Sequence, residues 1–299
     1  MKIKRLYQLA EKRKIAIGHF NVSNIETFEA AVRASKKTKK PIIIAVSEGA
    51  IEHSGLEFFV GAKDYYENKY NIELFLHLDH GYNLDIIGEA IHGGFDSVMF
   101  DGSHLDFSEN VRLTRSIVNQ AHRYGAAVEA EIGSIGGDEE NVKNRKIIFT
   151  DPLLAQDFVK KTNCDMLAVA IGTSHGIHKF LKKSELDFKL LEVLRKVIPV
   201  PLVLHGASMV RSELVMDLKE RGVKINNAIG VSAHDLKKAI GLGIRKINVD
   251  TDLQLAMIVE ILDNIYDGQD SLKLYKLLNQ AGKAMEEEVI RHIKLFSSK

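Results

Sequence analysis

Short apolar segments rich in β-branched residues recur along the whole chain. Their residues are continuously apolar and do not alternate with polar ones, which is typical of strands covered on both faces. Such strands belong to parallel sheets with helices packed around them. We therefore predict eight strands, at Ile15–Phe20, Pro41–Ser47, Ile72–Asp79, Phe95–Asp101, Ala126–Ile132, Asp165–Ile171, Val200–His205 and Ile244–Val249.

The segments between these strands place apolar residues at helical spacing. One of them starts with Pro152 directly after Thr150-Asp151, and proline suits the first turn of a capped helix. Strict alternation of strands and helices implies parallel strands joined by right-handed crossovers. The predicted helices include Ile25–Lys37, Asn110–Tyr124, Pro152–Lys161 and Leu186–Val197, and an extra helix lies between Leu272 and Phe296.

Two α/β architectures fit this alternation, a doubly wound open sheet and a closed barrel. The open sheet requires a glycine-rich phosphate-binding turn after the first strand, but here that turn reads Phe20-Asn21-Val22-Ser23. Eight strand–helix units in about 250 residues match the size of a (β/α)8 barrel. Because no linker or low-complexity stretch interrupts the chain, we predict a single-domain TIM barrel over residues 1–299 with an extra C-terminal helix.

Composition narrows the class of protein further. The chain has 41 Lys and Arg against 40 Asp and Glu, so no basic field is available to attract nucleic acid or an anionic membrane. Residues Met1–Lys14 contain no uninterrupted apolar run, which argues against a secretory signal or a membrane span. The single cysteine, Cys164, cannot form an internal disulfide, and its apolar surroundings indicate a core residue. We expect a cytoplasmic protein.

In such a barrel the active site forms at the C-terminal ends of the strands. Not every polar residue near these ends is expected to be functional. Because side chains alternate along a strand, His77 shares a face with Asp79 and not with His80, and we expect His77 to be structural. The predicted strand ends bring these polar residues to one rim: Asn21, Ser47, His77-Leu78-Asp79-His80-Gly81, Asp101-Gly102-Ser103-His104, Glu129-Ala130-Glu131, Gly172-Thr173-Ser174-His175-Gly176, His205-Gly206-Ala207-Ser208 and Asn248-Val249-Asp250-Thr251.

Three histidines of this rim form a candidate metal site. His80, His175 and His205 lie at the ends of the third, sixth and seventh strands, and each is followed by glycine. Three imidazoles with an open coordination position are typical of catalytic zinc. Asp101 and Glu131 are then candidates to accept imidazole N–H groups or to bind the metal at a second position.

Taken together, the motifs at the strand ends resemble the class II, zinc-dependent fructose-bisphosphate and tagatose-bisphosphate aldolases. The resemblance runs in order from about Gly18 to the C-terminus. It rests on Leu76-His77-Leu78-Asp79-His80-Gly81, Asp101-Gly102-Ser103, Glu129-Ala130-Glu131-Ile132-Gly133, Ala170-Ile171-Gly172-Thr173-Ser174-His175-Gly176, Leu204-His205-Gly206-Ala207-Ser208 and Asn248-Val249-Asp250-Thr251-Asp252.

This resemblance implies catalytic roles for specific residues. The three histidines would bind one zinc ion that acts as a Lewis acid on dihydroxyacetone phosphate. Asp79 matches the residue that exchanges a proton with the C4 hydroxyl of the sugar. Glu139, or alternatively Glu140, falls at the position of the loop glutamate that handles the C3 proton.

The resemblance also implies how a phosphosugar would be held. Backbone N–H groups and hydroxyls suffice to bind phosphate, and in this family a monovalent cation, Na+ or K+, assists. The reaction would be cleavage of fructose 1,6-bisphosphate in glycolysis and its reverse in gluconeogenesis, by homodimers or homotetramers. The candidate substrate-binding residues are Asn21, Ser47, Gly176, Lys179, Gly206, Ala207, Ser208, Asn248, Asp250 and Thr251.

One position departs from the pattern of the fructose enzymes. Asp250 favours the fructose branch over the tagatose branch, but Gln254 stands where many fructose enzymes have an arginine that reaches the second phosphate. Glutamine has neither the charge nor the bidentate fork of arginine. Either another cation, such as Lys179, Arg211 or one from a partner chain, holds that phosphate, or the aldehyde half is not glyceraldehyde 3-phosphate.

The sequence disfavours two other classes of protein. The zinc-barrel hydrolases usually carry a His-x-His pair after the first strand, where this chain reads His19-Phe20-Asn21. An inactive sugar-phosphate-binding relative would be indicated by loss of Asp79 or of a zinc ligand, and all of these are present. The alternative that stays open is another ketose phosphate, such as tagatose 1,6-bisphosphate.

Overall fold

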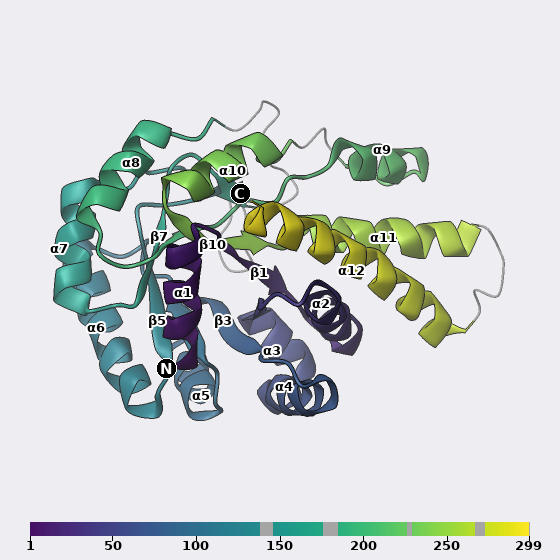
Figure 1. Cartoon of the computed structure of the whole chain (residues 1–299), viewed down its shortest axis with the longest axis horizontal. Coiled ribbons are helices and arrows are strands. Elements are labelled where there is room, and N and C mark those ends of the chain that lie inside the picture. The colour runs from purple at the N-terminus through teal and green to yellow at the C-terminus, as the bar shows by residue number, and fades with distance from the viewer. Residues whose placement is uncertain (138–145, 176–184, 226–228, 267–272, 299) are drawn as a thin grey trace.

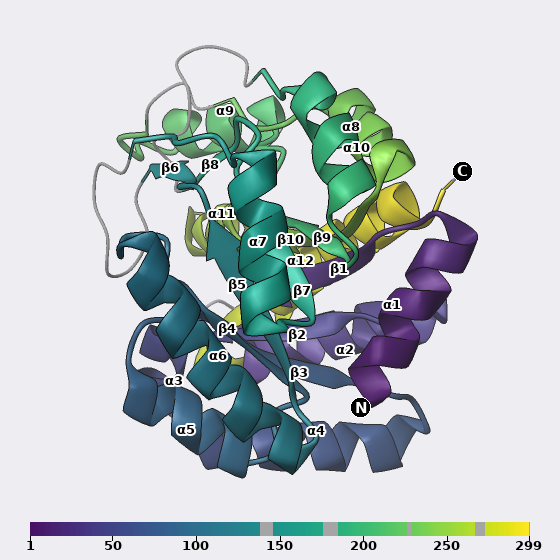
Figure 2. The same cartoon turned by 90° about the vertical axis from the view of Figure 1, so that its left-hand side faces the viewer.

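Eight parallel strands form a closed barrel, seen with its surrounding helices in Figures 1 and 2. The computed structural model describes residues 1–137, 146–175, 185–225, 229–266 and 273–298, with the backbone alone for residue 175. The predicted fold class is confirmed, and each predicted strand is present. In barrel order the strands are β1 (Ile17–Asn21), β10 (Ile244–Val249), β9 (Leu202–Leu204), β7 (Met166–Val169), β5 (Ala127–Ile132), β4 (Ser97–Phe100), β3 (Phe75–Gly81) and β2 (Ile43–Ser47).

Helices cover the outside of the barrel. The predicted start of one helix is confirmed, because the carboxylate of Asp151 accepts hydrogen bonds from the backbone N–H groups of Leu153 and Leu154, and Pro152 occupies the first turn. The described helices are α1 (Lys2–Arg13), α2 (Ile25–Thr38), α3 (Glu48–Ser54), α4 (Leu56–Tyr70), α5 (Leu84–His92), α6 (Phe107–Tyr124), α7 (Pro152–Thr162), α8 (Phe188–Val197), α9 (Ser212–Glu220), α10 (Ala233–Leu242), α11 (Thr251–Tyr266) and α12 (Leu274–Ser297).

The helix α1 covers the end of the barrel at which the strands begin. Ile3 and Leu6 of this helix are buried in one cluster with inward-facing residues of the strands, including Ile17, Phe75 and Val203. The sequence of this segment predicts no element, because its apolar residues are separated by charged ones. With the N-terminal end filled, the C-terminal end is left for chemistry.

The extra C-terminal helix is confirmed as α12, which packs along α2 and α11 (Figure 1). It buries Met285, Val289, Ile293 and Phe296 against them and against the barrel. The carbonyl of Phe296 accepts a hydrogen bond from the backbone N–H of Ala16, just before β1. This contact joins the end of the chain to the start of the barrel.

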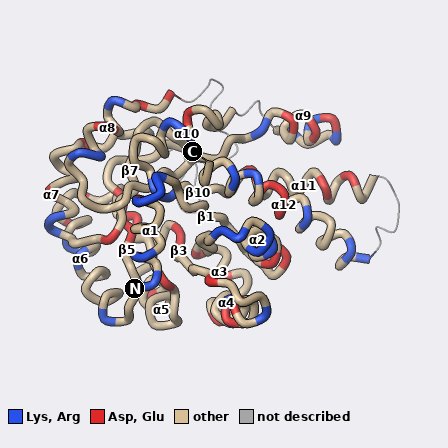
Figure 3. The backbone as a smooth tube through the Cα atoms, in the orientation of Figure 1, with Lys and Arg blue, Asp and Glu red and all other residues tan. Residues whose placement is uncertain are grey.

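Charges of both signs are interspersed along the outer helices (Figure 3). This mixture agrees with the near balance of acidic and basic residues in the sequence. Among the described helices, none is both long and apolar enough to cross a membrane.

Two further short strands lie outside the barrel. Gly136–Gly137 (β6) pairs in parallel with Ser174–His175 (β8), so that Gly137 lies opposite residue 175. These strands follow β5 and β7, and they therefore extend the C-terminal rim above the barrel.

Candidate active site

An irregular backbone at the end of β3 brings two consecutive side chains into one site. His80 has a φ of 47°, a conformation that residues other than glycine rarely adopt, and the β3–β4 pairing shifts register between Leu78 and Gly81. Regular alternation would place Asp79 and His80 on opposite faces. Instead, ligand atoms of Asp79, His80 and His205 lie within 4.8 Å of one another.

Glycine is required directly after this turn. A Cβ atom on Gly81 would lie 2.6 Å from the carbonyl oxygen of Met99 and 2.8 Å from the side chain of Ile87. The backbone at Gly81 therefore lies closer to β4 than any other residue allows. This close approach fixes the end of the strand that carries Asp79 and His80.

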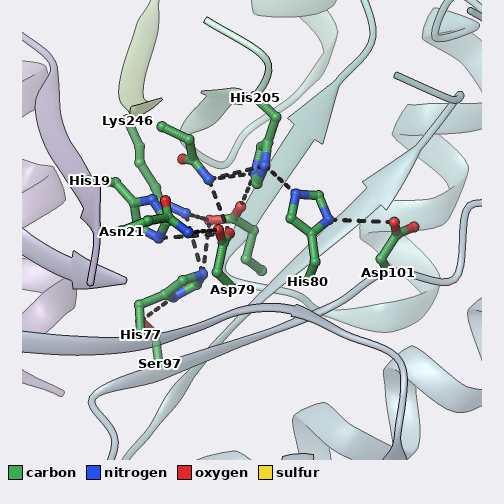
Figure 4. Close-up of polar contacts among 11 residues, drawn as sticks. His19, Asn21, His77, Asp79, His80, Ser97, Asp101, His205 and Lys246 are labelled. Atoms are coloured by element: carbon green, nitrogen blue, oxygen red, sulfur yellow. Dashed lines mark hydrogen bonds and ion pairs between the residues drawn. The ribbon is translucent and has the colours of Figure 1, made fainter. Parts of the chain in front are cut away.

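Two of the predicted metal ligands face each other across the rim (Figure 4). Nε2 of His80 lies 2.8 Å from Nδ1 of His205. The other nitrogen of His205, Nε2, lies 2.7 Å from Oε1 of Glu129. Because an ionised carboxylate only accepts hydrogen bonds, Nε2 carries the proton and Nδ1 presents its lone pair to the site.

Glu129 is itself held by a buried lysine that the sequence analysis did not assign. Nζ of Lys246, fully buried in β10, lies 2.7 Å from Oε2 of Glu129 and 3.3 Å from Nε2 of His77. The lysine can only donate, so Nε2 of His77 accepts and Nδ1 donates to the hydroxyl of Ser97 at 2.7 Å. Burial and the charge of Lys246 hold the pKa of His77 well below its usual 6.5. The expected structural role of His77 agrees with these contacts.

A second group of possible ligands shares His80 with the first. Ligand atoms of His80, Asp101 and Glu131 also lie within 4.8 Å of one another, and Oδ2 of Asp101 is 3.5 Å from Nδ1 of His80. Asp101 is further fixed by the hydroxyl of Tyr82 at 2.7 Å. The two predicted carboxylates therefore lie where they can orient His80 or bind a metal beside it.

Asp79 is buried and held by two amides. Its Oδ2 accepts a hydrogen bond from the side chain of Asn21 at 2.8 Å, and its Oδ1 accepts one from Asn248 at 3.1 Å. Nε2 of His19 lies 3.8 Å from Oδ1 of Asp79. Burial, and to a smaller extent the charge of Lys246, lowers the pKa of the His19 imidazole well below its usual 6.5. Asn21 and Asn248, expected to bind substrate, thus also fix the orientation of this carboxylate.

The predicted phosphate-binding segments lie at the ends of β9 and β10. Gly206 has a φ of 61°, and a Cβ atom there would lie 2.6 Å from the carbonyl oxygen of Ser174. The hydroxyl of Ser208 accepts from the backbone N–H of Asp250 at 3.3 Å, which connects the two segments. Two further predicted phosphate-binding residues of these segments, Ala207 and Thr251, are buried.

A buried acid–base cluster that the sequence analysis missed holds the loop after β9. The carboxylate of Asp252 accepts hydrogen bonds from the backbone N–H groups of Met209 and Val210, both at 2.7 Å. Its Oδ2 also lies 3.1 Å from Nε2 of His292 in α12. In the sequence Asp252 is the last residue of the motif at the end of β10, and this position does not reveal its partner in α12.

Several predicted residues lie outside the described part of the chain. They are Glu139, Glu140, Gly176 and Lys179, together with the side chain of His175. The backbone of His175 belongs to β8, next to Ser174, whose carbonyl oxygen packs against Gly206.

Comparison with known proteins shows the family of this chain. The sequence profile of the family "Fructose-bisphosphate aldolase class-II" matches residues 1–299. The fructose-bisphosphate aldolase of Thermus caldophilus is 40% identical over 286 residues, covering 94% of this chain and 93% of that protein. The corresponding enzyme of Helicobacter pylori strain 26695 is 36% identical over 292 residues, covering 97% and 95%.

A solved structure supports the same assignment. The crystal structure of the YdjI aldolase from Escherichia coli K12 superposes with a TM-score of 0.78 at 33% sequence identity, covering 98% of this chain and 96% of that one. A profile match over the full sequence and relatives of this identity and coverage show common descent. The chain therefore belongs to the class II fructose-bisphosphate aldolase family and is a metal-dependent lyase.

Proposed function

We propose that this chain is a zinc-dependent aldolase that reversibly cleaves fructose 1,6-bisphosphate, or a related ketose phosphate, into dihydroxyacetone phosphate and an aldehyde. The observation that carries the proposal is the placement of Asp79 beside the facing nitrogens of His80 and His205. Tagatose 1,6-bisphosphate is the alternative within the same chemistry.

The donor set fits zinc. Two imidazole nitrogens converge, and Glu129 selects the tautomer in which Nδ1 of His205 is a lone-pair donor. We propose His175 as the third ligand, because its backbone adjoins the Ser174–Gly206 contact next to His205. When bound, zinc supplies Lewis-acid polarisation of the ketone oxygen. Asp101 and Glu131 orient His80 or offer a second metal position.

We propose that Asp79 accepts the C4 hydroxyl proton as the C3–C4 bond breaks, and returns it during synthesis. A general base must lie within hydrogen-bond reach of its proton and be held in place. Asn21 and Asn248 hold one oxygen each of this carboxylate. The C3 proton is assigned to Glu139 or Glu140, and this role stays a prediction.

The phosphate of the ketone half would lie against the loops that follow β9 and β10. Ser208 and the backbone of these loops offer neutral donors, as phosphate binding at helix N-termini and loop nests requires. A monovalent cation beside the phosphate is part of the proposal. The proposed contacts are made by Gly176, Lys179, Gly206, Ala207, Ser208, Asn248, Asp250 and Thr251.

The test is a cleavage assay with and without a chelator. Fructose 1,6-bisphosphate, tagatose 1,6-bisphosphate and fructose 1-phosphate are supplied, and dihydroxyacetone phosphate release is followed. We expect release that stops when the metal is removed and returns when zinc is added back. Full activity after complete metal removal would rule out the proposed chemistry.

A further inference from the structure

The loop between β9 and α9 contains a strained residue close to the proposed phosphate site. In this β9–α9 loop (residues 205–211), Val210 is buried and has a φ of 48°. A left-handed conformation is rare for a β-branched residue, because its side chain crowds the backbone there. Such a conformation persists only where the surrounding structure holds it.

The carboxylate of Asp252 holds this residue. Its Oδ1 accepts a hydrogen bond from the backbone N–H of Val210, and its Oδ2 accepts one from that of Met209, both at 2.7 Å. Hydrogen bonds to an ionised carboxylate are about twice as strong as those between neutral groups. Asp252 is fully buried in α11, so a helix outside the loop fixes two consecutive N–H groups of the strained stretch.

The same stretch is also held through its carbonyl groups. The backbone N–H of Gly230 donates to the carbonyl oxygen of Met209 at 3.1 Å, and that of Val231 donates to the carbonyl oxygen of Ser208 at 3.2 Å. A Cβ atom on Gly230 would lie 2.1 Å from the carbonyl oxygen of Ser208, so only glycine allows this close approach.

Helix α12 in turn holds Asp252. Nε2 of His292 lies 3.1 Å from Oδ2 of Asp252, and Nδ1 of the same ring lies 2.9 Å from the backbone carbonyl oxygen of Glu288. The side chain of Glu288 pairs at 2.9 Å with Arg211, the last residue of the β9–α9 loop. Two residues one turn apart on α12 therefore fix both Asp252 and the end of the loop.

The strained stretch directly follows residues proposed to bind phosphate. Gly206, Ala207 and Ser208 belong to the β9–α9 loop. Neutral backbone donors bind a phosphate well only when several of them point at one centre, so their affinity depends on a fixed backbone. If Asp252 released the loop, Val210 would relax and the donors before it would lose their common direction.

We propose that Asp252 is a positioning residue for the ketone half of the substrate. It keeps the β9–α9 loop in the strained shape that binds phosphate, and α12 keeps Asp252 in place. This inference rests on the proposed function, in which that loop holds the phosphate of dihydroxyacetone phosphate. Asp252 itself lies outside the proposed contacts and acts through them.

The test measures the binding of dihydroxyacetone phosphate to Asp252→Asn. Asparagine has the shape of aspartate, but its amide N–H groups would face one of the two backbone donors and cannot accept from it. The dissociation constant of dihydroxyacetone phosphate, measured by calorimetry on the zinc-loaded protein, should rise about tenfold or more. The zinc content should stay near that of the wild type, because Asp252 is not a proposed ligand.

The matched control is Asp165→Asn. The carboxylate of Asp165 also accepts a backbone hydrogen bond, from Val128 at 2.8 Å, and lies 2.9 Å from a histidine, His122. Asp165 directly precedes β7, at the end of the barrel opposite to the proposed site. Its substitution should lower the melting temperature but leave the dissociation constant of dihydroxyacetone phosphate within about threefold of the wild-type value.

A second substitution separates positioning from a general loss of stability. Glycine adopts a left-handed conformation at little cost. Val210→Gly added to Asp252→Asn should therefore lower the dissociation constant again, by about threefold or more. The same change removes a buried side chain and should lower the melting temperature further. A role of Asp252 in stability alone would give no such rescue.

Binding and turnover together distinguish the outcomes. If the wild type binds no dihydroxyacetone phosphate and cleaves no ketose phosphate, the proposed function fails. If the wild type does both, but Asp252→Asn binds equally well or Val210→Gly gives no rescue, the function stands and the positioning role is rejected. His292→Phe, which keeps a buried ring without the contact to Asp252, is the second variant if Asp252→Asn does not fold. Its dissociation constant should rise at least about threefold, and an unchanged value would also reject the role.

Discussion

At the scale of residues, the site depends on one unusual backbone position. His80 adopts a left-handed conformation at the end of β3, and this puts Asp79 and His80 into the same cluster. A proposed metal ligand and a proposed proton carrier that are adjacent in sequence could then act on neighbouring atoms of one substrate. Strained backbone of this kind persists where the surrounding structure holds it, here through the close approach of Gly81 to Met99.

The proton-transfer role proposed for Asp79 predicts a selective loss of activity. Asp79→Ala should lower kcat by about 10²- to 10⁴-fold, the usual contribution of a positioned acid or base. Zinc content, measured by atomic emission on the purified protein, should stay near that of the wild type. Normal turnover in this variant would remove Asp79 from the mechanism.

For His205 we expect a different pattern, in which metal and activity are lost together. His205→Ala removes a proposed ligand and also removes the imidazole that contacts Oε1 of Glu129, a buried carboxylate paired with Lys246. We expect zinc content and turnover both to fall to a small fraction of the wild-type values. Retention of zinc with normal affinity would show that His205 is not a ligand.

At the scale of elements, α12 acts on the active site through a buried cluster. His292 of α12 contacts Asp252 at the start of α11, and Asp252 holds the backbone of the loop that follows Ser208. Glu288, one turn before His292, faces the same ring at 3.5 Å and pairs with Arg211. The C-terminal helix thus helps to fix a loop proposed to bind phosphate.

This cluster predicts a pH-dependent contribution to stability. Burial opposes protonation of His292, but the hydrogen bond and charge of Asp252 and the charge of Glu288 outweigh it and raise its pKa above the usual 6.5. Glu288 is also paired with Arg211 and Arg291. The ring of His292 further contacts the backbone carbonyl of Glu288 at 2.9 Å and the aromatic rings of Phe20 and Phe296. A raised pKa in the folded state stabilises the protein fully below the unfolded pKa, and the gain is lost as pH rises through the folded pKa.

The measurement is the melting temperature of His292→Gln relative to the wild type. Glutamine keeps a donor for Asp252 but cannot become charged. The difference in melting temperature should be larger near pH 6 than near pH 9, whereas a purely packing role would give the same difference at both values. The wild-type reference cancels the titration of all other groups.

At the scale of the whole molecule, the outer ends of α11 and α12 project from the barrel (Figure 1). Ile265, Tyr266, Leu274 and Tyr275 are each more than half exposed there. Exposed apolar groups of this size that gather at one place often mark contacts between subunits. They support the expectation of a homodimer or homotetramer, and sedimentation velocity at micromolar concentration should show no monomer.

Much of the fold was predictable because local periodicity carries it. All eight strands were predicted at nearly their observed positions, since each is a continuous apolar run between polar ends. The helix α1 was not predicted, because its few apolar residues are separated by charged ones and are buried only against the end of the folded barrel. The single domain over residues 1–299 and the cytoplasmic location stay predictions.

The sequence by itself determined the barrel, the order of its strands and the rim that carries Asp79, His80 and His205. These follow from patterns within a few residues, which set the direction of a strand and which end bears its polar groups. Only the tertiary structure decided which buried polar side chains contact one another. The pairing of Lys246 with Glu129 and that of His292 with Asp252 join segments far apart in the chain, and such contacts exist only after the barrel closes.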